Sequence, residues 1–266
     1  QWRPQEFDSL IGQDHISKTL ANAIKSGKIA HAYLFSGPRG TGKTSTAKIL
    51  AKALNCVEGP SPVPCNHCEN CLKINDGTSM DVFEIDAASN RGIDEIRDLR
   101  ESVKFSPVDG KFKVYIIDEV HMLTTEAFNA LLKTLEEPPS HVVFILATTE
   151  AHKIPATIHS RCQRYDFRKI TDAEIFARLQ YVAENMKIQV EPEVLRIIAT
   201  HADGGMRDAL SILDQCSTFA EVITVDAVRE ILGLIGREWI WALVEGLAEK
   251  NTKEGFSCLT EDEVRV

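Results

Sequence analysis

The chain has 266 residues, enough for one large or two ordinary domains with a sizeable core. Its net charge of −9 argues against a broadly basic surface that coats nucleic acid, although a local basic stripe is compatible with it. The sequence has no apolar run of about 18 residues, so we expect no membrane span and no membrane partner. Cysteines cluster between residues 56 and 71, which favours a metal site in a cytoplasmic protein over a secreted disulfide framework.

The N-terminal segment, residues 2–11, carries several apolar side chains ahead of a helix that we predict over residues 15–25. Trp2, Phe7 and Ile11 are compatible with two interpretations. They could be ordinary core residues, or they could form an apolar wall beside a nucleotide base. The residues alone leave these interpretations even.

A glycine-rich loop follows a short apolar strand at about residues 33–35 and precedes a helix that we predict over residues 45–54. The loop at residues 37–44 reads Gly-Pro-Arg-Gly-Thr-Gly-Lys-Thr, which matches the P-loop pattern in its strand–loop–helix context. Glycines let backbone N–H groups curl around a phosphate, and the helix N-terminus adds partial positive charge there. Lys43 would reach the β- and γ-phosphates, and the Thr44 hydroxyl would ligate Mg²⁺. The sequence therefore predicts binding of a nucleoside triphosphate.

Four cysteines follow the P-loop helix, namely Cys56, Cys65, Cys68 and Cys71, and the last three have C-x2-C-x2-C spacing. Four soft thiolates suit a closed tetrahedral Zn²⁺ site. We expect this zinc to be structural, because a catalytic zinc keeps an open coordination position. Free thiols and an iron–sulfur cluster are the alternatives, and His67 is a weaker substitute for one of the cysteine ligands.

A second strand is predicted over residues 82–86, followed by a helix from about residue 92. The next strand, predicted over residues 113–117, ends in Asp118 and Glu119. In a P-loop protein this is the Walker B pattern, in which Asp118 would hold Mg²⁺ through water and Glu119 would polarise the attacking water. Two acids after an apolar run are weak evidence when taken alone. Behind a P-loop in the same chain, they predict hydrolysis of the bound nucleoside triphosphate.

A helix is predicted over residues 125–135, and the prolines behind it stop it. The strand predicted over residues 141–147 ends in Thr148 and Thr149. Their hydroxyls could reach the γ-phosphate, although threonine also simply favours strands. A strand at residues 165–167 is expected to close the sheet.

From residue 169 the pattern becomes helical. Helix starts are marked by a capping box at residues 171–174, by Pro192 and by Thr224. We expect four helices up to residue 232. An amphipathic stretch beyond it predicts that a further helical domain begins there.

Several motifs occur in the order found in the gamma/tau family of bacterial DNA polymerase III clamp-loader subunits: SGPRGTGKT, the four-cysteine module, VYIIDEVHML, NALLKTLEEPP, LATTE, HSRC and GGMRDAL. The chain resembles this family over nearly its whole length. The resemblance implies an α/β AAA+ fold, with a nucleotide-binding domain over residues 1–167 that contains a parallel sheet and a zinc-binding insertion at residues 56–71. A small helical lid would occupy residues 168–232, and a truncated helical collar domain would begin at residues 233–266.

The resemblance also implies a function. The protein would be an ATPase of the DNA polymerase III holoenzyme that couples ATP binding and hydrolysis to loading a sliding clamp onto primed DNA during replication. ATP, Mg²⁺ and a structural Zn²⁺ would be its cofactors. Its partners would be the other clamp-loader subunits, the clamp and the DNA backbone, which it would contact without sequence specificity in the cytoplasm.

Catalytic roles in the family fall to the Walker B acids, two sensors and an arginine finger, which match Asp118, Glu119, Thr148, Thr149, Arg161 and Arg207. By this resemblance Thr149, with Thr148 adjacent, is the strand sensor and Arg207 is the lid sensor. Arg161 matches the finger, which acts in trans on the ATP of a neighbouring subunit. Without the resemblance, Arg161 would be interpreted as part of a surface ion pair and Arg207 as a charge at an interdomain surface.

The nucleotide would be held by the loop and by the N-terminal segment, through Gly37, Pro38, Arg39, Gly40, Thr41, Gly42, Lys43, Thr44, Ser45, Trp2, Arg3, Pro4 and Ile11. DNA would be gripped at three stretches that carry Asn90 and Arg91, Lys133, and Lys153. Asn90 is uncharged, which weakens the expectation for that contact.

Two other functions compete. The chain could be another AAA+ machine, such as a branch-migration helicase or a replication initiator, or a non-enzymatic scaffold that keeps a nucleotide-like fold. An initiator would need a helix-turn-helix module, which this sequence does not show. The intact set of Lys43, Thr44, Asp118 and Glu119 speaks against a scaffold.

Overall fold

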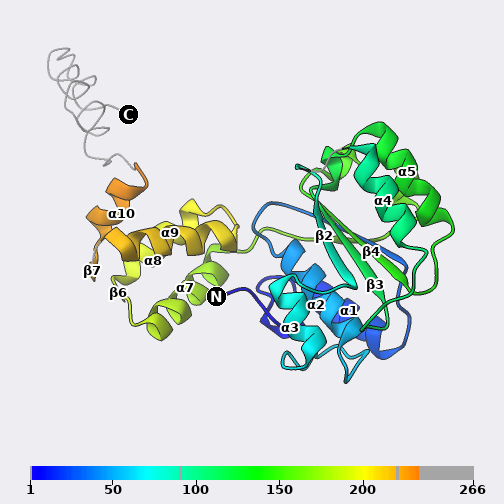
Figure 1. The fold of residues 1–266 in the computed structure, drawn as a ribbon. Helices are drawn as coiled ribbons and strands as arrows, with labels where there is room; N and C mark the ends of the chain where they lie inside the picture. Colours follow the sequence, from blue (N-terminus) through cyan, green and yellow to red (C-terminus); the bar gives the residue numbers. More distant parts are fainter. Residues whose placement is uncertain (1, 90–91, 220–221, 234–266) are drawn as a thin grey trace, which may run out of the picture. The chain divides into compact units, whose positions relative to one another are not determined.

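A computed structural model describes residues 2–89, 92–219 and 222–233 of the chain (Figure 1). The chain separates into two compact units. The first comprises residues 1–174 and 204–206, and the second comprises residues 175–203 and those that follow residue 206. The predicted collar lies outside the described residues, except for Gly233. None of the described helices is long and apolar enough to cross a bilayer.

The first unit is an α/β layer structure. Its strands are β1 Ala32–Ser36, β2 Val82–Asp86, β3 Lys113–Asp118, β4 Val142–Thr148 and β5 Gln163–Asp166. Its α-helices are α1 Asp14–Lys25, α2 Lys43–Asn55, α3 Glu69–Asp76, α4 Ile93–Ser102, α5 Thr125–Glu136 and α6 Ala156–His159. Three 3₁₀ turns complete it: η1 Phe7–Ser9, η2 Val120–Met122 and η3 Ala151–Lys153.

The five strands form one parallel sheet in the order β2-β3-β4-β1-β5. Helices cover both faces, so strands β1 and β4 read as continuous apolar runs and are buried along their length. Tyr33 and Phe35 of β1 point to the core on the side of α1 and α2. Leu34 points to the opposite core, which α4 and α5 close. Figure 1 shows these helices on the two sides of the sheet.

The parallel sheet between helices confirms the α/β class predicted from the sequence. The P-loop helix begins at Lys43 rather than at residue 45, because the chain enters helical geometry directly after the left-handed Gly42. The closing strand lies at residues 163–166 rather than 165–167 and pairs with β1. Helix α3 was not predicted, since its eight residues bury little more than Cys71 and Ile74.

The second unit is mainly helical, as predicted. It contains α8 Pro192–His201 and α10 Val225–Ile231, together with most of α7 Asp172–Met186 and of α9 Met206–Phe219. A two-stranded parallel pair, β6 Gln189–Val190 and β7 Val222–Ile223, was not expected from the sequence. Both of its strands have only two residues, which is too short for an alternating pattern to appear.

One buried carboxylate holds the loop that leads into β3. Asp81 is 1% exposed, and its two oxygens accept backbone N–H groups of Val108, Asp109 and Gly110 at 2.6–2.7 Å. Charge-assisted hydrogen bonds of this kind are stronger than neutral ones. Asp81 therefore fixes how the chain turns into β3, whose far end carries the Walker B acids.

We expect Asp81→Ala to lower the free energy of unfolding by about 2–4 kcal/mol, because it leaves three backbone N–H groups without their carboxylate acceptor. Urea denaturation measures this loss. Asp76→Asn, on the exposed end of α3, is the control and should change stability by less than about 0.5 kcal/mol. Equal stability of the two variants would contradict the role of Asp81.

Candidate nucleotide site and cysteine module

Three neighbouring strands place their functional ends at one edge of the sheet. Strand β4 lies between β1 and β3, and all three run parallel. The P-loop follows β1, the two acids end β3, and the two threonines end β4. Loops at the carboxyl edge of a parallel sheet are where ligands bind in such folds. The P-loop and β4 are also joined directly, because Gly37 N donates to Thr148 O at 3.2 Å.

The P-loop backbone adopts conformations at Gly37 and Gly42 that favour glycine over other residues. Gly37 has φ +146°, and a Cβ placed on it would lie 2.3 Å from the Phe167 carbonyl oxygen. Gly42, at φ +99°, is the N-cap of α2 and offers no side-chain cap to the first turn. The N–H groups of that turn are thereby left available to an anion at the positive end of the helix dipole.

Lys43 is folded back onto its own loop. Its Nζ donates to Gly37 O at 2.8 Å and to Pro38 O at 2.7 Å, and the residue is only 6% exposed. Burial lowers the pKa of Lys43, while the nearby carboxylates of Glu119 and Asp118 act in the opposite direction. The ammonium is thus held at the loop, where phosphate oxygens could replace the carbonyls as acceptors.

Thr44 and Asp118 form a pair of oxygen donors suited to Mg²⁺. Thr44 Oγ1 donates to Asp118 Oδ2 at 2.6 Å, and Asp118 Oδ1 accepts the Glu119 backbone N–H at 2.9 Å. Mg²⁺ prefers hard oxygen ligands and is usually bound by one or two protein groups together with substrate phosphates. The hydroxyl and the carboxylate therefore fit the metal.

Glu119 is held between two strand ends. Its backbone has φ +48°, in the left-handed region that non-glycine residues seldom adopt. Its Oε2 accepts a hydrogen bond from Thr149 Oγ1 at 3.1 Å and lies 3.4 Å from His121 Nδ1. Such a backbone costs of order 1–3 kcal/mol and persists where surrounding contacts fix it. The carboxylate is one-third exposed.

The two threonines differ in what they do. Thr148 is fully buried, and its Oγ1 accepts the Glu150 N–H at 3.0 Å and lies 2.9 Å from His121 Nδ1. Thr149 faces Glu119 instead. The sequence reasoning missed His121, which touches both Thr148 and Glu119; its only signal is its position two residues after the second Walker B acid.

Arg161 makes its contacts with residues other than those at the carboxyl edge of the sheet. Its guanidinium donates to Glu136 Oε1 at 2.7 Å and to Thr157 O at 2.8 Å. Among the described residues, its remaining polar contact is with the neighbouring Ser160. The ion pair with Glu136 is the contact expected of a surface charge. A role of Arg161 in the site of another subunit is therefore a proposal, which rests on the family resemblance.

The other residues predicted for the sites differ in how far they are buried. Phe7 is 3% exposed and belongs to the core, whereas Trp2, Pro4 and Ile11 are partly buried and Arg3 is exposed. Arg207 is exposed at the start of α9 in the second unit. Lys133 is exposed on α5, and Lys153 is exposed and paired with Glu150. Asn90 and Arg91 lie outside the described residues.

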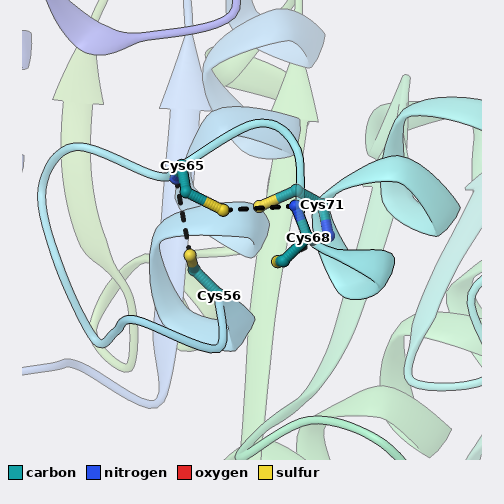
Figure 2. Close-up of side chains that lie close together, drawn as sticks. All are labelled: Cys56, Cys65, Cys68 and Cys71. Carbon is teal, nitrogen blue, oxygen red and sulfur yellow. Dashed lines mark hydrogen bonds between the residues drawn. The ribbon is translucent and has the colours of Figure 1, made fainter.

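The four cysteines of the predicted module come together at the far end of α2 from the P-loop. Cys56 follows the last residue of α2, Cys65 lies in the next loop, and Cys68 and Cys71 open α3. Figure 2 shows their sulfurs facing one another, and all four sulfur atoms lie within 4.8 Å of one another. A tetrahedral zinc with Zn–S bonds of about 2.3 Å needs sulfurs about 3.8 Å apart. The donor set therefore fits one Zn²⁺.

Backbone N–H groups donate hydrogen bonds to cysteine sulfurs in this module. Cys65 N donates to Cys56 Sγ at 3.4 Å, and Cys68 N donates to Cys65 Sγ at 3.3 Å. Burial raises the pKa of Cys56 and Cys71. Burial also acts to raise the pKa of Cys68, but hydrogen bonds from the Val57 and Cys71 N–H groups and from neighbouring thiols lower it to about 6.

His67 does not share this cluster. Its side chain is largely exposed, with Nδ1 2.8 Å from the Cys65 carbonyl oxygen and Nε2 3.7 Å from Glu58 Oε1. Its ring groups with Glu58 and Cys65 rather than with the four sulfurs. The geometry favours the four cysteines as the ligand set over a set in which His67 replaces one of them.

Comparison with known proteins decides the family. A family model described as "DNA polymerase III, delta subunit" matches residues 12–171, and one described as "DNA polymerase III clamp loader subunit, ATPase lid domain" matches residues 174–221. DNA polymerase III subunit tau of Bacillus subtilis is 56% identical over 98% of the chain and 46% of its own length. DNA polymerase III subunit gamma of Buchnera aphidicola from Acyrthosiphon pisum is 43% identical over 98% of the chain and 73% of its own length. The chain belongs to the gamma/tau family of DNA polymerase III clamp-loader subunits.

This membership confirms the resemblance inferred from the motifs. The chain spans less than half of the length of tau relatives such as those of Bacillus subtilis and Escherichia coli K12, of which it covers 46% and 41%. Among solved structures, the RuvB Holliday junction branch migration motor of Thermotoga maritima matches 99% of the chain and 88% of its own, with a TM-score of 0.64 and 20% identity. At this identity the likeness shows a shared fold and carries no statement about function.

We expect gamma/tau-family protein of this sequence, purified without chelator, to contain one zinc per chain, and Cys68→Ser to lose it. The variant should also lose at least about 2 kcal/mol of stability, because structural zinc contributes folding free energy. Elemental analysis and thermal unfolding measure both effects. His67→Ala is the matched control and should keep its zinc, and native protein without zinc would refute the site.

Proposed function

We propose that this chain is the ATP-driven motor subunit of a bacterial clamp loader, which couples ATP binding and hydrolysis to loading of the sliding clamp onto primed DNA. The observation that carries the proposal is the meeting of Lys43, the Thr44–Asp118 pair and the Glu119–Thr149 pair at one edge of the sheet. Membership in the gamma/tau family supports the clamp-loading role. Companion subunits, the clamp and the DNA backbone are the partners that this role requires.

Each residue at the sheet edge has a task in this proposal. The loop N–H groups and Lys43 hold the phosphates, and the Lys43 ammonium exchanges its bonds to loop carbonyls for bonds to phosphate oxygens. Thr44 and Asp118 hold Mg²⁺, which supplies charge neutralisation on the phosphates when bound. Glu119 orients the attacking water and accepts its proton, and the Thr149 hydroxyl fixes the carboxylate. Arg207 of the lid and the N-terminal segment complete the binding of the nucleotide.

Glu119→Gln keeps the size of the side chain and the hydrogen bond to Thr149 but removes the charge that activates water. We expect ATP to bind with near-normal affinity and hydrolysis in the assembled complex to fall by about 100- to 10,000-fold. Single-turnover hydrolysis and a binding titration separate the two effects. Glu126→Gln, on the exposed first turn of α5, is the control. Turnover near the normal rate in Glu119→Gln would move the catalytic base elsewhere.

We further propose that Arg161 acts in trans on the ATP of the adjacent subunit. Its support is twofold: the HSRC motif matches the family's finger, and its guanidinium is held by Glu136 rather than by the loop of its own chain. An arginine delivered by a neighbour stabilises charge on the transferred phosphoryl group, so hydrolysis then depends on assembly. The ion pair with Glu136 would hold the side chain until a neighbour's γ-phosphate offers a better partner.

Arg161→Ala should leave the chain's own ATP affinity nearly unchanged and lower hydrolysis in the adjacent site by roughly 10³-fold. Mixing Arg161→Ala with Lys43→Ala subunits tests the shared site. Mixed assemblies should regain activity, because an intact finger from one variant can face an intact P-loop from the other. If Arg161→Ala abolishes ATP binding by the isolated chain, the residue acts in cis and the proposal fails.

We also propose that the four-cysteine module holds a structural Zn²⁺, and that DNA backbone is contacted near residues 90–91, at Lys133 and at Lys153. The sulfur cluster supports the first proposal. The exposure of Lys133 and Lys153 supports the second, since phosphate contacts are made by accessible basic side chains. Lys133→Ala should weaken binding of primed DNA uniformly across sequences, as expected of a phosphate contact.

A further inference from the structure

A buried lysine lies between the cysteine module and the N-terminal segment. Lys52 belongs to α2 and is 1% exposed. Its Nζ donates to Gln5 Oε1 at 2.6 Å, to Gln5 O at 3.1 Å and to Asn66 Oδ1 at 2.7 Å. A buried ammonium is tolerated only where its donors are satisfied, and these three bonds use all of its N–H groups. None of the roles assigned above to the nucleotide or zinc site accounts for it.

The two partners of Lys52 belong to segments that are far apart in the sequence. Asn66 lies in the turn between Cys65 and Cys68, two of the proposed zinc ligands, and has φ +61°, so the turn sets the backbone from which its side chain projects. Its Nδ2 also donates to Glu6 Oε1 at 3.2 Å, which gives a second link to the N-terminal segment. Glu6 in turn caps η1 through Ser9. The turn at the metal site therefore holds the start of η1 in place.

The same segment continues to the P-loop. Beyond η1, Leu10 is buried, and its Cδ2 lies 3.7 Å from where a Cβ on Gly42 would be. Gln13 is fully buried and exchanges hydrogen bonds with the Arg168 backbone at 2.8 and 3.2 Å. Residues 5–13 are thus tied at one end to Lys52 and Asn66 and at the other to residue 168, and they pass beside the phosphate loop between these ties.

We propose that Lys52 is a positioning residue that joins the cysteine module to the N-terminal segment, so that a metal-bound module orders the segment beside the P-loop and thereby tightens nucleotide binding. This inference rests on the proposed ATP site. Metal ligation at Cys65 and Cys68 would hold the turn that contains Asn66. This turn and Lys52 then hold Gln5 and Glu6 through hydrogen bonds. Gln5 and Glu6 in turn restrict the position of residues 7–11. A loose segment would have to be ordered each time a nucleotide binds, and that loss of conformational freedom weakens the apparent affinity.

The test compares two variants with a matched control in the full chain. Lys52→Met keeps the length of the side chain without its donors, and Asn66→Gly removes the acceptor while tolerating the left-handed backbone. Lys73→Met, on α3 of the same module, removes a lysine that pairs only with Glu69 and Asp109 among the described residues. The measurements are zinc content, hydrogen exchange of residues 2–11 and ATP affinity by titration calorimetry.

Both test variants should retain zinc, exchange residues 2–11 faster and bind ATP about 3- to 20-fold more weakly, the range that one or two hydrogen bonds are worth. Lys73→Met should match the unaltered protein. Unchanged ATP affinity in Asn66→Gly overturns the inference even if Lys52→Met fails to fold, and so does weaker binding without faster exchange of residues 2–11. Lys43→Ala separates this from failure of the ATP site, because ATP binding that survives that change would refute the proposed site itself.

Discussion

The placement of β4 between β1 and β3 is the constraint on which the candidate site depends. In this order three parallel strands end side by side. Each strand end carries a different part of the candidate nucleotide site. The Gly37–Thr148 and Thr44–Asp118 hydrogen bonds then join the loop after β1 to both other strand ends. In a strand order that did not place β4 between β1 and β3, the same residues would be present in the sequence but the three strand ends would not lie side by side.

Helix α2 connects this edge to the cysteine module. It has 13 residues and so spans about 20 Å, with the P-loop at its first residue and Cys56 directly after its last. The N-terminal segment makes a second connection between the same two places through Lys52 and Leu10. The module is therefore attached to the candidate nucleotide site by two routes, which supports the proposed influence of the module on nucleotide binding.

Local pattern was enough to predict much of this molecule. The P-loop, the acids after β3 and the cysteine spacing are short motifs whose chemistry depends on neighbours in the sequence. Sequence patterns did not reveal which side chains meet across long separations. Thr149 rather than Thr148 faces Glu119 because burial of β4 turns Thr148 inward, and His121, Lys52 and Asp81 each have a partner 27 to 47 residues away. The proposed role of Arg161 rests on the family resemblance, because an arginine paired with Glu136 has no local signature of a finger.

In the proposed function hydrolysis is a property of the assembly, because the proposed base, Mg²⁺ ligands and phosphate loop lie in one chain while the proposed finger would come from another. The most direct measurement is the steady-state ATPase rate of this chain alone and after addition of companion clamp-loader subunits, sliding clamp and primed DNA, with Lys43→Ala as the background. The account predicts a very low rate for the lone chain and a rise of about 10³-fold when all components are present. A lone chain that hydrolyses ATP as fast as the complete assembly would contradict it.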